Sequence, residues 1–338
     1  MARRLRYVRG CAVLHEVWPF VEEHGRRGVP VVIARLVGRD GPGSRPLGAA
    51  MAVASDGQWR GSVSGGCVEG MVLDVARAVL AGAPARLIDV LPGGDLLPWE
   101  EGPACVGALR VLVTPAPPAA VAAAITRAVA DGLPLAVGVG LRAPHMWVSA
   151  GSRDELDVCG GLFIEELVPR ARLVLVGATD LAAALARSAE PLRRAVVVLD
   201  PRPDHVASGA FPADALVVRA WPDAWLAGHP LGADDALVVL SHDPRIDDRA
   251  LRAALGGRAG FVGALGSRAT HAGRLRRLYG TPGLERLIGP VGLDIGGVST
   301  AETALSILAQ VVASEHGRGG MPLSSGRTAI HAELTGGR

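Results

Sequence analysis

The second half of the chain alternates short, continuous apolar segments with segments of helical periodicity. From residue 171 onward the expected strands are 173–176, 195–199, 215–218, 236–240 and 261–262, and the expected helices are 180–188, 246–255 and 267–278. Apolar strands separated by helices are typical of a parallel sheet that is covered on both faces. The sequence therefore predicts a Rossmann-like, doubly wound domain over 171–314, followed by a Gly-rich tail over 315–338.

The turn after the first of these strands departs from a dinucleotide-binding turn. Such domains carry G-x-G-x-x-G there, and an acid about 20 residues later holds a ribose. Asp200 supplies the acid, but only Gly177 of the three glycines is present, and Asp180 brings negative charge toward a phosphate. The pattern disfavours tight NAD(P) binding. The candidate nucleotide-like pocket consists of residues that follow strands: Gly177, Thr179, Asp180, Asp200, Ser241, Gly266, Ser267 and Arg268.

A glycine-rich run, residues 61–70, lies in the first half of the chain and reads Gly-Ser-Val-Ser-Gly-Gly-Cys-Val-Glu-Gly. The apolar residues beyond it recur at helical spacing and predict a helix over 68–81. Cys67 then lies at a helix start, where unpaired backbone N–H groups attract anions. An ordinary glycine turn beside a buried, inert cysteine is the alternative interpretation.

The segments around this run predict an α/β domain over 11–168. Strands over 47–54 and 58–63, joined by a turn at 56–57, place Cys67 and the loop that contains Arg45 at one end of a sheet. An irregular stretch over 91–107 carries Cys105. Three further strands over 135–141, 145–148 and 162–167 predict a small additional sheet.

Composition excludes several classes of function. The chain has no lysine, so a P-loop lysine and Schiff-base chemistry are excluded. A net charge of +2 with interspersed signs argues against a nucleic-acid partner. Four widely spaced cysteines without a C-x-x-C pair argue against a zinc ribbon. Neither a signal peptide nor an apolar run of about 18 residues is found, so we expect a cytoplasmic protein that does not enter a membrane.

The run at 61–69 resembles the signature of the XdhC/CoxI family, accessory proteins of xanthine dehydrogenase-like and CO dehydrogenase-like molybdenum enzymes. Further similarities are Ser-His-Asp at 241–243, Gly-Ala-Leu-Gly-Ser-Arg at 263–268 and Pro-Val-Gly-Leu-Asp-Ile-Gly at 290–296. Two segments depart from the family. Residues 105–107 read Cys-Val-Gly in place of Cys-Gly-Gly, and residues 177–180 read Gly-Ala-Thr-Asp in place of Gly-Ala-Gly-His.

The resemblance implies an accessory factor that transiently binds the molybdenum cofactor and assists its sulfuration and insertion into an apo-molybdenum hydroxylase. It also implies a cysteine desulfurase-type sulfur donor and a homodimer, and it requires no catalytic residue. Two candidate thiols without an adjacent His argue against a metal that the protein itself ligates. The implied cofactor-binding residues are Arg45, Ser64, Gly65, Gly66, Cys67, Glu69 and Cys105. Two alternatives stay open: an NAD(P)-dependent oxidoreductase with an atypical Rossmann turn, and a non-catalytic interaction protein whose ligand site has decayed.

Overall fold

The chain divides into two compact units between Pro169 and Arg170, which we call unit 1 and unit 2. The computed structural model describes residues 13–40, 44–90, 108–141, 146–149, 162–167, 169–207 and 210–326. The predicted thiol of Cys105 lies outside these residues. Within the described ranges, no helix is long and apolar enough to cross a membrane.

Unit 1 is built on a five-stranded sheet whose neighbouring strands are all antiparallel, in the order β3-β2-β1-β5-β4. Its strands are β1 (Val31–Arg39), β2 (Ala50–Ala54), β3 (Trp59–Gly61), β4 (Arg86–Val90) and β5 (Leu109–Pro115). In the described residues, three helices accompany them: α1 (Leu14–Arg26), α2 (Glu69–Leu80) and α3 (Ala119–Asp131).

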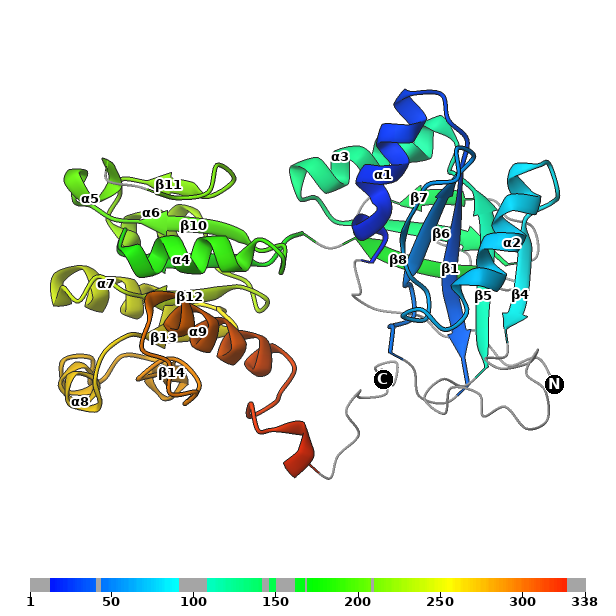
Figure 1. Cartoon of the computed structure of the whole chain (residues 1–338). Coiled ribbons are helices and arrows are strands. Elements are labelled where there is room, and N and C mark those ends of the chain that lie inside the picture. The colour runs from blue at the N-terminus through cyan, green and yellow to red at the C-terminus, as the bar shows by residue number, and fades with distance from the viewer. Residues whose placement is uncertain are drawn as a thin grey trace. The chain divides into compact units, whose positions relative to one another are not determined.

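The central strand β1 is buried on both faces, because α2 covers one face of the sheet and α1 and α3 cover the other (Figure 1). Val32 and Ala34 pack with the apolar face of α2. Val31 and Ile33, which point the opposite way, pack with α1 and α3. This alternation fixes the register of the strand, since a slip of one residue would exchange the two faces.

The predicted small sheet is present in unit 1 as a separate three-stranded sheet, β7-β6-β8. It comprises β6 (Leu135–Gly140), β7 (Met146–Ser149) and β8 (Leu162–Leu167). Val139 and Phe163 of this sheet pack against Val37 and Leu112 of the larger one. The two sheets thus share a core.

Unit 2 is the predicted doubly wound domain. Its six strands are all parallel, in the order β11-β10-β9-β12-β13-β14. They are β9 (Arg172–Val176), β10 (Ala195–Leu199), β11 (Leu216–Val218), β12 (Ala236–Val239), β13 (Phe261–Ala264) and β14 (Leu287–Ile288). Strands β10 and β11 are added on one side of β9 and the later strands on the other, so the strand order reverses between β9 and β12. Sheets of this kind form their ligand crevice at that point.

Helices cover both faces of this sheet. The helices of unit 2 are α4 (Asp180–Ala189), α5 (Pro203–Ala207), α6 (Pro222–Gly228), α7 (Pro244–Leu255), α8 (Arg268–Arg277) and α9 (Thr300–Glu315), with single 3₁₀ turns at Leu284–Arg286 and Leu323–Ser325. Helices α4 and α9 pack together on one face (Figure 1), and α6 and α7 pack on the other. The Rossmann-like prediction is therefore confirmed.

Several predicted boundaries were wrong for reasons that the backbone explains. The strand expected over 47–54 begins only at Ala50, because Gly48 has a φ of +93°. The strand expected over 58–63 ends at Gly61, whose φ of +87° turns the chain out of the sheet. Helices α5 and α6 were not predicted, since segments of five and seven residues are too short to show helical periodicity.

Candidate functional site

The loop between β3 and α2 is organised by the carboxylate of Glu69. Its Oε1 accepts hydrogen bonds from the Ser62 hydroxyl at 2.5 Å, the Val63 amide at 3.1 Å and the Ser64 amide at 3.0 Å. Its Oε2 accepts from the Ser64 hydroxyl at 2.6 Å and the Val68 amide at 3.2 Å. Glu69 is only 7% exposed. A single buried carboxylate therefore fixes the conformation of the loop.

These bonds determine the ionisation of Glu69. Burial disfavours the charged form, but the hydrogen bonds from Ser62 and Ser64 outweigh it and lower the pKa of Glu69 to about 2. The carboxylate is thus an anion that the chain itself supplies at the start of α2, where the helix dipole favours negative charge. We predicted Glu69 as a cofactor ligand; that role stays a prediction, and both of its oxygens already accept bonds from the loop.

Ser64 is the second organising residue of the loop. Its buried hydroxyl accepts hydrogen bonds from the Cys67 amide at 3.0 Å and the Val68 amide at 3.1 Å. The Gly65 amide donates to the Ser62 hydroxyl at 2.7 Å. The amides that were expected to meet an external anion are consequently bonded to the loop's own side chains.

The outer edge of the loop presents the groups that remain available to a ligand. Gly65, Gly66 and the thiol-bearing Cys67 are all exposed. Gly66 has a φ of +120°, and a Cβ built there would meet nothing within 4 Å. The interpretation of Cys67 as a buried core cysteine is therefore wrong. Its thiol lies beside a bare backbone that a ligand can approach closely.

Arg45 lies on the loop that borders the Cys67 loop. The neighbouring Ser44 donates a short hydrogen bond to the carbonyl of Ser64 and ties the two loops together, as the predicted strand arrangement implied. Arg45 Nη2 is 2.6 Å from Oε2 of Glu16, while its buried Nε has no partner among the described residues. One edge of this guanidinium is therefore committed to α1.

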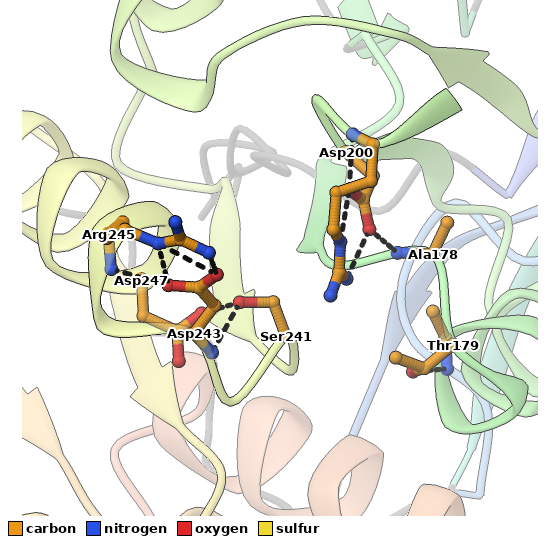
Figure 2. Close-up of polar contacts among 9 residues, drawn as sticks. Ala178, Thr179, Asp200, Ser241, Asp243, Arg245 and Asp247 are labelled. Atoms are coloured by element: carbon orange, nitrogen blue, oxygen red, sulfur yellow. Dashed lines mark hydrogen bonds and ion pairs between the residues drawn. The ribbon is translucent and has the colours of Figure 1, made fainter. Parts of the chain in front are cut away.

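The β9–α4 turn of unit 2 is also closed by a carboxylate (Figure 2). Asp200 is fully buried, and its Oδ2 accepts from the Ala178 amide at 2.8 Å and from Arg202 Nη2 at 2.7 Å. Its Oδ1 accepts from the amide and Nε of Arg202, both at 2.9 Å. Although burial opposes ionisation, these bonds lower the pKa of Asp200. The acid predicted for a ribose is fully occupied by the protein.

The remaining residues of this turn are also in use. Thr179 is the N-cap of α4, and its hydroxyl accepts from the Ala182 amide at 3.2 Å. Gly177 is buried with a φ of +109°, and a Cβ there would lie 2.7 Å from the Ser241 amide nitrogen. Asp180 alone of the four turn residues is exposed, in the first turn of α4. The turn is therefore packed closely against Ser241, which follows β12.

Ser241 follows β12 and donates to the buried Asp247 at 2.6 Å (Figure 2). One strand further on, Gly266 has a φ of +142° and Ser267 caps α8, its hydroxyl accepting from the Thr270 amide at 3.1 Å. Arg268 begins α8 and is exposed. The structure thus places the predicted pocket residues after β9, β10, β12 and β13, in line with their predicted positions.

Sequence reasoning missed the partners on which these sites depend. Ser44, Arg202 and Asp247 were not singled out, and each bonds a residue that was. Arg202 had a visible signal, since it follows Asp200 by two residues across a proline. Within the described part of the chain, no group of three or more His, Cys, Asp or Glu side chains is placed to hold a metal ion.

Comparison with known proteins identifies relatives of both units. The model of the XdhC and CoxI family matches residues 25–90, which include the Cys67 loop, and the model of the XdhC Rossmann domain matches residues 173–311. A probable xanthine dehydrogenase subunit from Bacillus subtilis is 26% identical over 316 residues, 83% of this chain and 92% of the relative. The molybdenum cofactor insertion chaperone PaoD of Escherichia coli is 26% identical over 298 residues, 86% of each chain.

The fold is also found in a solved structure. A crystal structure described as a xanthine dehydrogenase from Bacillus halodurans superposes with a TM-score of 0.73 and 23% identity, covering 92% of this chain and 98% of the other. At this identity the likeness shows the fold alone. With the two family models, which match the Cys67 loop and nearly all of unit 2, it supports the predicted resemblance. The chain belongs to the XdhC and CoxI family.

Proposed function

We propose that this chain is an accessory factor that holds the molybdenum cofactor at the Cys67 loop of unit 1 and assists its insertion into a xanthine dehydrogenase-type enzyme. Family membership and the relative named as a molybdenum cofactor insertion chaperone support this role. The observation that carries it is the exposed thiol of Cys67, presented by a loop whose own polar groups are internally bonded.

The residues of the loop fit a ligand that carries a phosphate group and a metal that accepts sulfur donors. The Cys67 thiol is a soft donor of the kind that suits molybdenum. Gly66 leaves the backbone next to the thiol uncovered, since a Cβ built there would meet nothing within 4 Å. The Arg45 guanidinium lies on the adjoining loop and carries positive charge for a phosphate. When bound, the cofactor supplies the metal centre at which the served enzyme works.

The buried side chains of the loop have a positioning role in this proposal. Glu69 and Ser64 fix the backbone of residues 62–68, so that Cys67 needs no rearrangement to meet the ligand. A preorganised loop binds more tightly because less freedom is lost on binding. Cys105 is the second proposed thiol, and it lies outside the described residues. Assistance to sulfuration, a cysteine desulfurase-type donor and a homodimer are the finer parts of the proposal.

Co-purification tests the role. The wild-type chain and the Cys67→Ser variant are expressed in a molybdenum-replete host, and molybdenum and pterin are measured in the purified proteins. We expect Cys67→Ser to lower retention of both about tenfold, which corresponds to about 1.4 kcal/mol of binding. Cys159→Ser is the control for loss of a thiol, since Cys159 is not one of the proposed cofactor-binding residues. Unchanged retention in Cys67→Ser would remove the thiol from the site and leave the proposal without its main support.

The nicotinamide alternative has less support. Both oxygens of Asp200 accept bonds from Arg202, and Oδ2 also accepts from the Ala178 amide, so a ribose would have to displace the Asp200–Arg202 ion pair. Titration of NAD(H) and NADP(H) against the purified chain separates the two functions, and micromolar binding would favour the oxidoreductase. The third alternative, an interaction protein with a decayed ligand site, predicts capture of an apo-hydroxylase without any pterin.

A further inference from the structure

Helix α8 begins differently from the other long helices of unit 2. The first turns of α4, α7 and α9 each contain an acidic residue, namely Asp180, Asp247 and Glu302. The first turn of α8 contains none and instead opens with Arg268. Because the first amides of a helix have no intrahelical acceptor, acids in this turn compensate their partial positive charge. At α8 the chain supplies no such anion.

A buried guanidinium beneath this helix start is the independent observation. Arg274 is 2% exposed, and its Nη2 donates to the Leu265 carbonyl at 3.0 Å and lies 3.4 Å from Oδ2 of Asp247. Its Nε and Nη1 are buried and have no hydrogen-bond partner among the described residues. Leaving donors of a buried charge unsatisfied is costly, so a position that keeps them implies a missing acceptor.

Besides its bond to Leu265, the guanidinium also approaches the turn at Gly266. Nη1 of Arg274 lies 3.8 Å from the position that a Cβ on Gly266 would take. Gly266 has a φ of +142° and no side chain, and Thr270 Cγ2 and Cβ lie 3.1 and 3.2 Å from the same Cβ position. The turn follows β13, whose carboxyl end lies beside that of β12 in the parallel sheet. The helix start therefore faces the edge at which such sheets bind ligands.

Asp247 is the only carboxylate that contacts Arg274 in the described residues, and it is shared. Its Oδ1 accepts the hydroxyl hydrogen of Ser241, while Oδ2 faces Arg274 at 3.4 Å, longer than a strong ion pair. His271, one turn before Arg274, carries a buried Nδ1 without a partner in the described chain and adds no negative charge. Together with Arg268, the cluster therefore retains an excess of positive charge.

We propose that the turn formed by residues 265–268 binds the phosphate group of a small-molecule ligand. The first amides of α8, the Ser267 hydroxyl and the Arg268 side chain are its donors, and Arg274 supplies buried charge from below. This site goes beyond the proposed cofactor role, since it uses residues of unit 2 alone. Inorganic phosphate is therefore a sufficient probe, and loss of this site would leave molybdenum retention at the Cys67 loop unaffected.

Calorimetric titration of the full chain with inorganic phosphate tests the site. We expect saturable binding to the wild type and about tenfold weaker binding to Gly266→Ala, because the added methyl lies over the guanidinium and 3.1 Å from Thr270 Cγ2. If Gly266→Ala does not fold by circular dichroism, Arg268→Ala decides, with an expected loss of severalfold. Ser299→Ala at α9 is the matched control and should leave binding unchanged, since Glu302 already occupies that helix start.

Two outcomes of the titration would contradict the proposal, and two would support it. No saturable binding at about 10 mM phosphate, or equal losses in Ser299→Ala and the folded α8 variant, would overturn the proposal. Adenosine diphosphate provides the second arm of the experiment. Displacement of phosphate by the nucleotide supports the site and assigns it to a nucleotide phosphate. Retention of phosphate in its presence supports a site for a free phosphate or a smaller ester.

Discussion

In this molecule, two turns that lead from a strand into a helix are each held in place by a buried carboxylate, yet the two turns expose different groups to solvent. In the β3–α2 turn the acid is Glu69, which belongs to the helix itself and bonds the loop from inside. In the β9–α4 turn it is Asp200, which follows the neighbouring strand β10 and bonds the Ala178 amide. Both acids satisfy buried donors that would otherwise be costly.

The difference lies in what remains outside. The first turn exposes Gly66 and the Cys67 thiol, whereas in the second Gly177 is packed against Ser241 and Ala178 is buried. A turn that keeps only the first glycine of a binding loop is thus used for packing here, and a carboxylate at a helix start can fix the conformation of a loop instead of binding a ligand. Only the first turn keeps a reactive side chain next to open backbone.

Removal of the Glu69 carboxylate should have the largest effect on this contrast. Glu69→Ala leaves the buried amides of Val63 and Ser64 without an acceptor, and we expect a loss of roughly 3 to 5 kcal/mol in the unfolding free energy of unit 1. Hydrogen exchange resolved by peptide measures it, with unit 2 as the internal reference. Glu302→Ala, which removes an exposed carboxylate from α9, is the control and should cost less. Equal effects would show that the internal bonds of the Cys67 loop are unimportant.

Acidification should reproduce part of this loss. The pKa of Glu69 is about 2 in the folded chain and about 4.5 when unperturbed, so its contribution is complete above about pH 4.5 and is lost as the pH falls toward 2. The loss is smaller than that from alanine, because the protonated acid keeps its place and an acceptor oxygen. Amide exchange of residues 62–70 between pH 5 and pH 2.5 follows it. In Glu69→Gln this pH dependence should disappear; if it persists, another group is responsible.

The second turn should respond most to its glycine. Gly177→Ala places a methyl 2.7 Å from the Ser241 amide nitrogen at a φ that side chains rarely adopt, and we expect a loss of about 3 kcal/mol in unit 2. Gly280→Ala is the matched control, since Gly280 has a φ of +79° with nothing within 4 Å of a Cβ. Denaturant unfolding compares the two. If Gly177→Ala loses no more unfolding free energy than Gly280→Ala, the β9–α4 turn can accommodate a side chain at residue 177.

The sequence predicted unit 2 well because its strands are continuous apolar runs, a pattern that a parallel sheet requires and that few other folds share. It also predicted the positions of Cys67 and Asp200, because each lies next to an identifiable element: Cys67 precedes α2, and Asp200 follows β10. It did not predict how Glu69 or Asp200 is used. The role of Asp200, for example, depends on a partner that the fold brings close to it, the Ala178 amide 22 residues away in the sequence. Local periodicity carries no information about such contacts.

The smallest expected change in stability is the most informative about the Cys67 loop. Gly66→Ala meets no atom within 4 Å, so only the backbone conformation at a φ of +120° opposes it, at a cost of about 1 kcal/mol. Gly82→Ala at the end of α2 is matched, with a φ of +101° and equally open space. If the open space at Gly66 is where a cofactor approaches Cys67, the two variants will lose similar stability while only Gly66→Ala loses retained molybdenum and pterin. Equal retention in both would mean that the ligand meets the thiol from another side, and that the bare backbone of this turn is no more functional than the packed glycine of the β9–α4 turn.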